Sequence, residues 1–306
     1  TSVNAGEMSV TGTMQATYQS EVSDVTGNPL GMNTDLTFTG ETEVLDGTAV
    51  KWTMGTDGTF LSESGADHKI TFASPYGTFK VGNSGDSANA VDDITPSAFE
   101  EANGSGSGTY STDFGSGLEG SMSVGFAKSD LMGSGVSVDL TYYPKLDGKL
   151  NNEKGASADA GSGAKSAKSA NVKIDMGKVP YLDAADGLVI TAGYAHSSST
   201  SDELQSKEDG TIAANYSYGP IKVGYQKKAY APVATAATTK DFYKDDIIGI
   251  AYAVNDSLAI SYNKIESERH QQGANAEQST TAINLAYTVG GLTIGFQDAQ
   301  TDDAAY

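Results

Sequence analysis

The chain has no cysteine among its 306 residues, which excludes disulfide bonds, thiolate metal sites and cysteine nucleophiles. It has a single arginine, Arg269, and a formal net charge of −20. Binding to nucleic acid requires clustered lysine and arginine side chains that neutralise phosphates, so no nucleic-acid partner is expected. The excess of carboxylates favours small cations instead.

Long hydrophobic runs are also missing. The longest, IIGIAYAV at 247–254, is far shorter than the roughly 20 residues that a membrane-spanning helix needs, which excludes a membrane protein built from helices. Hydrophobic residues make up only 38% of the chain, and its 36 glycines favour turns and strands over long helices. We therefore expect an all-β protein. No change in composition divides it into two domains.

The first five residues, TSVNA, fit two interpretations. Val3 and Ala5 stand where a signal peptidase site has small residues, so residues 1–5 can be the remnant of an export signal. They fit a frayed terminus equally well. The single domain is expected to span residues 6–306.

Apolar and polar residues alternate along about fifteen segments of the chain. In GEMSVTGTMQATY, residues 6–18, Met8, Val10 and Met14 share one parity and the polar side chains share the other. The pattern recurs from LTFTGETEV at 36–44 to LTIGF at 292–296. A period of two over such segments predicts strands with one apolar and one polar face.

The connectors between these segments alternate in length. Short or moderate links follow the even-numbered segments, whereas long polar links follow the odd-numbered ones, at 20–33, 55–67, 84–108, 145–170, 196–209, 229–241 and 266–278. An up-and-down antiparallel sheet places all short links at one end and all long links at the other. This is typical of a transmembrane β-barrel, whose apolar face meets lipid. Aromatic residues near both ends of the segments fit the two girdles of such a barrel.

With the segments arranged in this way, the chain resembles the bacterial outer-membrane general porins. GEMSVTGTMQATY is most similar to alphaproteobacterial members, and ITFASPYGTFKVGN, residues 70–83, resembles the turn between the fourth and fifth strands of porins. The resemblance implies a barrel of 16 strands in the outer membrane of a Gram-negative bacterium, in contact with lipid and lipopolysaccharide. It also implies a homotrimer and a third long loop, here 84–108, that folds into the barrel and narrows the pore.

The candidate pore constriction combines this loop with the polar parity of three strands. Lys51, Lys69 and Lys80 point away from the apolar parity and are predicted to face the lumen, although ordinary solvated lumen positions explain them equally well. If the loop folds inward, the carboxylates facing these lysines are expected among Asp86, Asp92, Asp93, Glu100 and Glu101. A channel walled by low-dielectric material focuses the resulting field across its opening.

The chain departs from the enteric porins at two points. It lacks their arginine cluster on the wall facing the third loop, and it stops at TDDAAY after the fifteenth predicted strand. Single-chain bacterial barrels usually have an even number of strands, so we expect one further strand, ending on an aromatic residue, after residue 306.

No part of the sequence predicts an enzyme. The three histidines, His68, His196 and His270, fall at or within long connectors without metal-ligand spacing, and GSGSG at 104–108 lacks the residues of a phosphate loop. The acidic segments 84–93 and 183–187 could supply Ca²⁺ ligands, but neither has the spacing of an EF-hand, so no cofactor is expected.

The sequence thus predicts a water-filled, cation-preferring channel for the passive diffusion of small hydrophilic solutes. The alternative is a secreted or surface-anchored β-rich adhesin, built as a solenoid or a sandwich without a pore. Such a protein would explain the glycine, serine, threonine and acidic-residue content of the chain equally well. It would not explain the alternating connector lengths, and no fixed repeat period supports a solenoid.

Overall fold

A computed structural model describes most of the chain: residues 7–20, 29–44, 47–57, 67–100, 102, 114–115, 118, 121–146, 166–198, 203–237, 240–271 and 274–303. Residues 1–5, the candidate signal remnant, lie outside these ranges. No helix in the described ranges is long and apolar enough to span a membrane.

The described residues form 15 strands and four short 3₁₀ turns. The strands are β1 (Glu7–Tyr18), β2 (Leu30–Glu43), β3 (Ala49–Asp57), β4 (Asp67–Ser74), β5 (Gly77–Gly82), β6 (Ser123–Lys128), β7 (Val136–Tyr143), β8 (Ala167–Asp175), β9 (Leu188–Ser197), β10 (Lys207–Tyr218), β11 (Ile221–Ala231), β12 (Asp241–Asn255), β13 (Leu258–Gln271), β14 (Ala274–Val289) and β15 (Leu292–Asp302). The 3₁₀ turns are η2 (Asn89–Val91), η3 (Leu131–Gly133), η4 (Met176–Lys178) and η5 (Asp183–Ala185).

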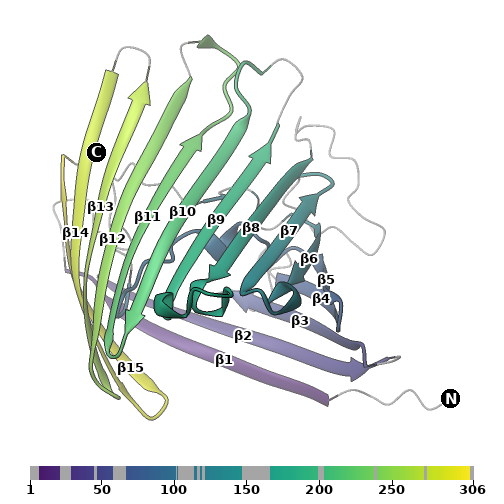
Figure 1. Cartoon of the computed structure of the whole chain (residues 1–306). Helices are drawn as coiled ribbons and strands as arrows, with labels where there is room; N and C mark the ends of the chain where they lie inside the picture. Colours follow the sequence, from purple (N-terminus) through teal and green to yellow (C-terminus); the bar gives the residue numbers. More distant parts are fainter. Residues whose placement is uncertain are drawn as a thin grey trace.

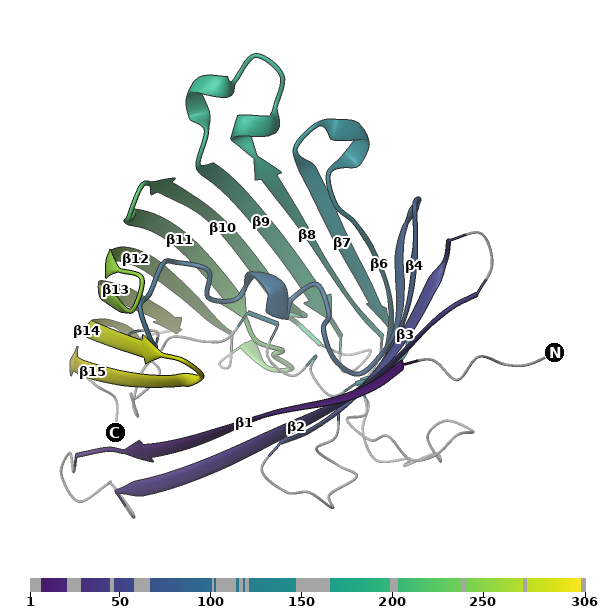
Figure 2. The same ribbon diagram turned by 90° about the horizontal axis from the view of Figure 1, so that it is seen from below.

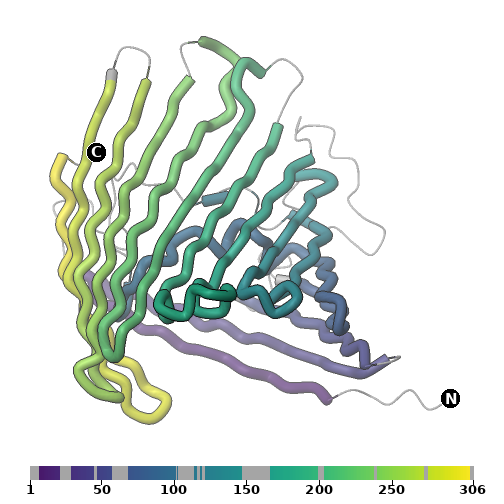
Figure 3. Tube along the Cα trace, viewed as in Figure 1, coloured from purple at the N-terminus to yellow at the C-terminus, as the bar shows by residue number. Residues whose placement is uncertain are grey.

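All 15 strands belong to one sheet in sequence order, and each strand pairs antiparallel with the next. Figures 1 and 3 show this sheet as a single tilted layer that curves round on itself. The predicted up-and-down topology and strand count are confirmed, and a single curved layer is neither a solenoid nor a sandwich of two packed sheets. Within the described residues β1 and β15 are the two edges of the sheet. The sixteenth strand stays a prediction.

The two faces of the sheet follow the parity of the sequence. Apolar side chains lie in register on the convex face, as in the row that joins Val50, Phe72, Phe79, Phe126 and Leu140 across β3 to β7. The pattern matches a wall that meets lipid, because Phe72, Phe79 and Leu140 of this row remain exposed on the outside of the sheet. Tyrosines mark both ends of this apolar band, at Tyr18, Tyr142, Tyr194, Tyr225 and Tyr262 toward the long connectors and at Tyr218, Tyr252 and Tyr287 toward the short ones.

Several predicted connectors are shorter than the sequence pattern indicated. Most of 266–278 is strand, because β13 ends at Gln271 and β14 begins at Ala274. The segment 145–170 likewise gives its last residues to β8, which begins at Ala167. Above the tyrosine band both faces of the strands meet polar surroundings. Hydropathy therefore stops alternating there, although backbone pairing continues.

At the short-link end the turns are tight and depend on local backbone geometry. Gly77 ends the SPYG turn with φ of 144°, and a Cβ there would lie 2.5 Å from the ring of Phe126. Glycine is the residue that fits both conditions. The resulting turn sets the register of β4 and β5, which places Lys69 and Lys80 on the same face of the sheet.

Most of the buried apolar residues form two clusters on the concave face, each of which includes residues of the connector 83–122. One cluster joins Val91, Phe114 and Leu118 of the connector to Tyr143 and Ala195 of the wall. A second joins Ala102 of the connector to Ile247, Ile265 and Ala282. In Figure 2 the part of the connector that contains η2, drawn in blue, crosses the hollow of the curved sheet. The buried core of this fold therefore lies between the connector and the inner face of the sheet.

Candidate functional site: the inward connector

The connector 83–122 begins with a turn that the sequence specifies locally. The Asp86 carboxylate accepts hydrogen bonds from the backbone N–H groups of Ala88 (2.7 Å) and Asn89 (2.9 Å). An aspartate that binds the backbone two and three residues ahead initiates a turn. This turn starts η2, so Asp86, which is buried, has a structural role at the entry of the connector.

Polar side chains of the wall hold the connector at three places. At the first, the Ser87 N–H donates to Thr141 Oγ1 (3.0 Å), and the hydroxyl groups of Ser87 and Ser169 lie 2.6 Å apart. Asn171 Nδ2 donates to the Ser87 carbonyl at 2.7 Å. These contacts join the start of the connector to β7 and β8. They also show that Thr141, Ser169 and Asn171 face the inside of the sheet.

The second anchor is Gln226 on β11, whose side chain is fully buried. Its Oε1 accepts from the Ile94 N–H (3.0 Å), and its Nε2 donates to the Val91 carbonyl (3.0 Å) and lies within hydrogen-bond distance of the Asp92 carbonyl. One amide side chain thus serves three backbone groups of the connector. Leaving such buried groups without partners costs about 1–3 kcal/mol each.

The third anchor lies on β13 to β15. Ser261 Oγ accepts from the Ala98 N–H (2.9 Å), and Asn263 Nδ2 donates to the Pro96 carbonyl (2.9 Å). Beyond them, Phe99 of the connector lies over Gly295 of β15, where a Cβ would come within 2.3 Å of the ring. The connector is therefore held along the wall from β7 to β15.

Glycines on the inner face let the connector approach the wall closely. At four inward-facing positions an added Cβ would lie 2.3–2.6 Å from an atom of the connector. The four are Gly193 beneath Val91, Gly224 and Gly249 beneath Pro96, and Gly295 beneath Phe99. Side chains at these positions would push the connector toward the middle of the lumen.

The connector's central carboxylates form an ion cluster with Lys228 of β11. Lys228 Nζ lies 2.8 Å from Asp93 Oδ1 and 3.2 Å from Asp92 Oδ1, and its side chain is only 3% exposed. Asp92 Oδ1 also accepts from the Phe114 N–H at 2.5 Å. Burial raises the pKa of Asp92 to about 6, because the loss of hydration, with repulsion from Asp93, outweighs the attraction of Lys228.

The three predicted wall lysines lie on the predicted face, but they do not share one environment. Lys80 forms an ion pair with Asp139 of β7 (2.6 Å) and donates to the Gly85 carbonyl (3.3 Å). Lys69 lies beside Gly85, where a Cβ would be 2.5 Å from Nζ. Lys51 is exposed and stands in register with Glu41 of β2. Lys69 and Lys80 thus meet the start of the connector.

The predicted acidic residues are distributed along the connector. Asp92 and Asp93 meet Lys228 of the β11 wall, a residue that the sequence pattern did not single out. Glu100 is partly buried, and its carbonyl accepts from Ser97 Oγ (2.6 Å). Glu101 lies outside the described residues. Asp92 and Asp93 thus pair with Lys228 and not with the predicted Lys51, Lys69 or Lys80, and Lys80 pairs with Asp139 within the wall.

Within the ranges that the structure covers, no group of three or more His, Asp or Glu side chains is arranged to hold a metal ion. The three histidines belong to strands rather than to connectors. His68 lies on β4, His196 on β9 and His270 on β13, where it contacts Glu268 at 2.9 Å. The Ca²⁺ sites considered for 84–93 and 183–187 stay predictions.

Sequence reasoning missed the residues that hold the connector. Gln226, Asn263 and Asn284 are inward-facing amides with at most 2% exposure, but the sequence shows them only as polar residues of a wet face. On a strand face that meets only water, serine or threonine is sufficient. A large amide side chain there is therefore a weak sign that the residue binds a buried partner. Only the register of the strands in the structure shows that these three amides, which are far apart in the sequence, lie beneath one segment of the connector.

Comparison with known proteins gives a consistent result. The sequence profile described as Gram-negative porin matches residues 1–304, and no curated protein matches. OmpF of Salmonella typhi, solved with daunomycin, superposes with a TM-score of 0.64 at 14% identity, covering 96% of this chain and 90% of that one.

Two further structures show the same fold. The trimer form of OmpT from Vibrio cholerae gives a TM-score of 0.64 at 14% identity, with 98% and 89% of the two chains covered. A mutant of the Rh. blastica porin gives 0.58 at 15% identity, with 94% and 93% covered. With the family match over nearly the whole chain, these findings establish that the protein belongs to the Gram-negative porins, which are β-barrel channels of the bacterial outer membrane and not enzymes.

Proposed function

We propose that this porin passes small hydrophilic solutes by passive diffusion and that its channel prefers cations. The observation that carries the proposal is the connector 83–122, which is held against the inner wall and brings Asp92, Asp93 and Glu100 into the lumen. A segment in this place narrows the aqueous path, and charges beside a narrow path act on every ion that passes.

The balance of charge near the connector supports a negative potential. Lys228 faces both Asp92 and Asp93, so this cluster keeps an excess of one carboxylate at neutral pH. Lys80 is neutralised by Asp139. The chain as a whole carries a net charge of −20, and the apolar band on the convex face leaves the lumen and the loops to hold it. Within a Debye length of about 8–10 Å this excess attracts cations.

The experiment measures reversal potentials of the refolded protein in a planar bilayer under a KCl gradient. The wild type should favour K⁺ over Cl⁻. Combined replacement of Asp92 and Asp93 by Asn and of Glu100 by Gln should lower the permeability ratio, because three negative charges leave the lumen while Lys228 remains. Glu266→Gln is the matched control, since Glu266 lies on the convex face and pairs with Lys264 (2.7 Å). A wild type selective for Cl⁻, or a triple variant with unchanged selectivity, would refute the proposal.

We also propose that the protein assembles as a homotrimer in contact with lipid and lipopolysaccharide. One matched structure, OmpT of Vibrio cholerae, is described in a trimer form, and the extent of the likeness supports extending that assembly to this chain. Exposed apolar side chains on the convex face supply surface for both lipid and subunit contact. Light scattering of the protein in detergent measures the assembly directly.

A further inference from the structure

The convex face carries a groove across β5 to β9. Its lining is almost entirely apolar, and the cavity has a volume of about 440 Å³. Phe79, Phe126, Leu140, Ala170 and Tyr194 follow one another in register across these five strands. Four of the five are large, whereas Ala170 ends at a methyl group. The groove is therefore a depression at Ala170, bordered by Leu140 and Tyr194.

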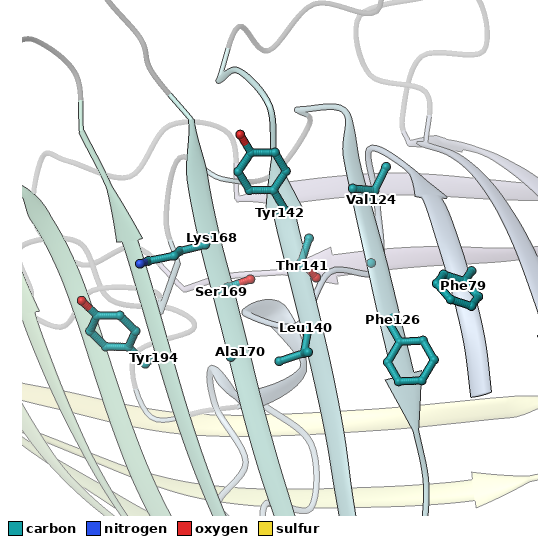
Figure 4. A pocket seen from close by; sticks show the side chains of 11 residues that line it. Phe79, Val124, Phe126, Leu140, Thr141, Tyr142, Lys168, Ser169, Ala170 and Tyr194 are labelled. Atoms are coloured by element: carbon teal, nitrogen blue, oxygen red, sulfur yellow. The ribbon is translucent and has the colours of Figure 1, made fainter. Parts of the chain in front are cut away.

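The next row toward the long-connector end is polar on β7 to β9. Tyr142 on β7, Lys168 on β8 and His196 on β9 are paired in register. Their chain neighbours Thr141 and Ser169 face inward, because they contact Ser87 of the connector, so Tyr142 and Lys168 point outward. In Figure 4 the Lys168 ammonium group extends toward the side of Tyr194, whereas the Tyr142 hydroxyl group points away from it.

Lys168 differs from the other outward-facing lysines of the strands. Lys227 pairs with Asp246, Lys244 with Glu268 and Lys264 with Glu266, while Lys128 donates to the Pro75 carbonyl. In the part of the chain that the structure covers, no carboxylate pairs with Lys168. Glu208 is the nearest acid in its row, two strands away, with His196 between them. Among the described residues, the cation at the mouth of this apolar groove thus has no carboxylate partner.

This arrangement fits one class of ligand. A lysine whose stem lies along apolar surface and whose ammonium reaches the membrane interface attracts anionic head groups. The hydroxyl group of Tyr194, on the neighbouring strand, can also donate to a phosphate oxygen. An acyl chain attached to such a head group would run along the groove over Ala170. A second copy of this chain would need a carboxylate on its apolar face to match Lys168.

We propose that this groove binds one acyl chain of a phosphate-bearing glycolipid, the lipid A part of lipopolysaccharide, with its phosphate against Lys168. The choice of lipid rests on the proposed contact with lipopolysaccharide and on orientation, since long connectors lie on the outer side of such barrels. Lys168 is near the long-connector end of β8. It therefore faces the leaflet where this glycolipid resides.

The test uses the full chain refolded in a non-ionic detergent, with diphosphorylated lipid A as the probe and native mass spectrometry as the measurement. Lys168→Gln should weaken binding about tenfold, because a charge-assisted contact worth roughly 1.5 kcal/mol is lost. Ala170→Phe, which fills the groove while keeping the face apolar, should weaken binding to a similar extent. Lys264→Gln removes an outward lysine outside the groove and should bind like the wild type.

Four outcomes would overturn the inference. One is unchanged binding by both groove variants, and another is an equal loss in Lys264→Gln, which would indicate general attraction to surface charge. The third is equal binding of phosphatidylglycerol. If Ala170→Phe lowers the oligomer mass without lipid, the groove is a subunit contact and the proposal is also wrong. Conductance of Lys168→Gln in a planar bilayer should equal that of the wild type. A wild type that does not conduct would refute the channel and not the lipid site.

Discussion

At the scale of single residues, Asp92 links the position of the connector to pH. Its pKa is raised to about 6, chiefly by burial, so the folded protein binds this proton more tightly than the unfolded chain does. The contribution of Asp92 to folding is therefore complete below about pH 4 and is lost as pH rises through about 6. The ion pair with Lys228 reduces the free-energy cost of burying the ionised Asp92 carboxylate, but it does not remove that cost.

This titration predicts a pH-dependent selectivity. As pH falls from 7 to 5, Asp92 gains a proton and the lumen loses a negative charge, so the K⁺ over Cl⁻ permeability ratio should fall. Carboxylates with ordinary pKa values remain ionised in this range, and the three histidines are on outward-facing positions. Reversal potentials measured across the range should show the step in the wild type and in Glu266→Gln. The step should be smaller in Asp92→Asn than in the wild type, and an unchanged step there would assign it to another group.

At the scale of elements, the connector depends on Gln226. Gln226→Leu keeps the volume but leaves the Val91 carbonyl and the Ile94 N–H without their partners, at about 1–3 kcal/mol each. We expect the barrel to form and the connector to detach more often, which should appear as larger current fluctuations in single-channel recordings and as faster proteolysis within 84–108.

Gln15→Leu is the control for this prediction, because Gln15 is an exposed residue of β1 on the same polar parity, and no hydrogen bond joins it to the described part of the connector. A Gln226→Leu channel as quiet as the control would mean that the other two anchors suffice. A variant that fails to form a heat-modifiable band would place Gln226 in barrel folding instead.

The same element shows how far sequence reasoning reaches. Alternation of side chains predicted all 15 strands and the inward parity of Lys51, Lys69 and Lys80, because lipid on one face and water on the other impose a strict period of two. Strand ends near Gln271 and Ala274 were not predictable, since polar residues occupy both faces there. The pairing of Asp93 with Lys228 could not be predicted either. The two residues are 135 positions apart, and the sequence does not tell which strand the connector contacts.

At the scale of the whole molecule, the proposed contact with lipid on the convex face takes the place of a conventional core, and exchanging two neighbouring residues tests this contact. Val172 on β8 points outward and is the middle one of three outward apolar positions, with Ala170 and Ile174 on either side, whereas Lys173 points inward. The double change Val172→Lys with Lys173→Val keeps composition and net charge constant. It moves one ammonium group from the lumen into the hydrocarbon band.

We expect this exchange to destabilise the folded protein in lipid vesicles by about 2–4 kcal/mol, the cost of a lysine near the bilayer midplane on the outside of a barrel. Lys173→Val alone keeps the outer face intact and should change stability by less than about 0.5 kcal/mol, as surface substitutions do. Urea unfolding followed by the fluorescence of Trp52, the single tryptophan, on the outward face of β3, measures both variants. Equal stability of the exchanged and single variants would mean that Val172 meets water or protein rather than lipid, and the assignment of the convex face would then be wrong for β8.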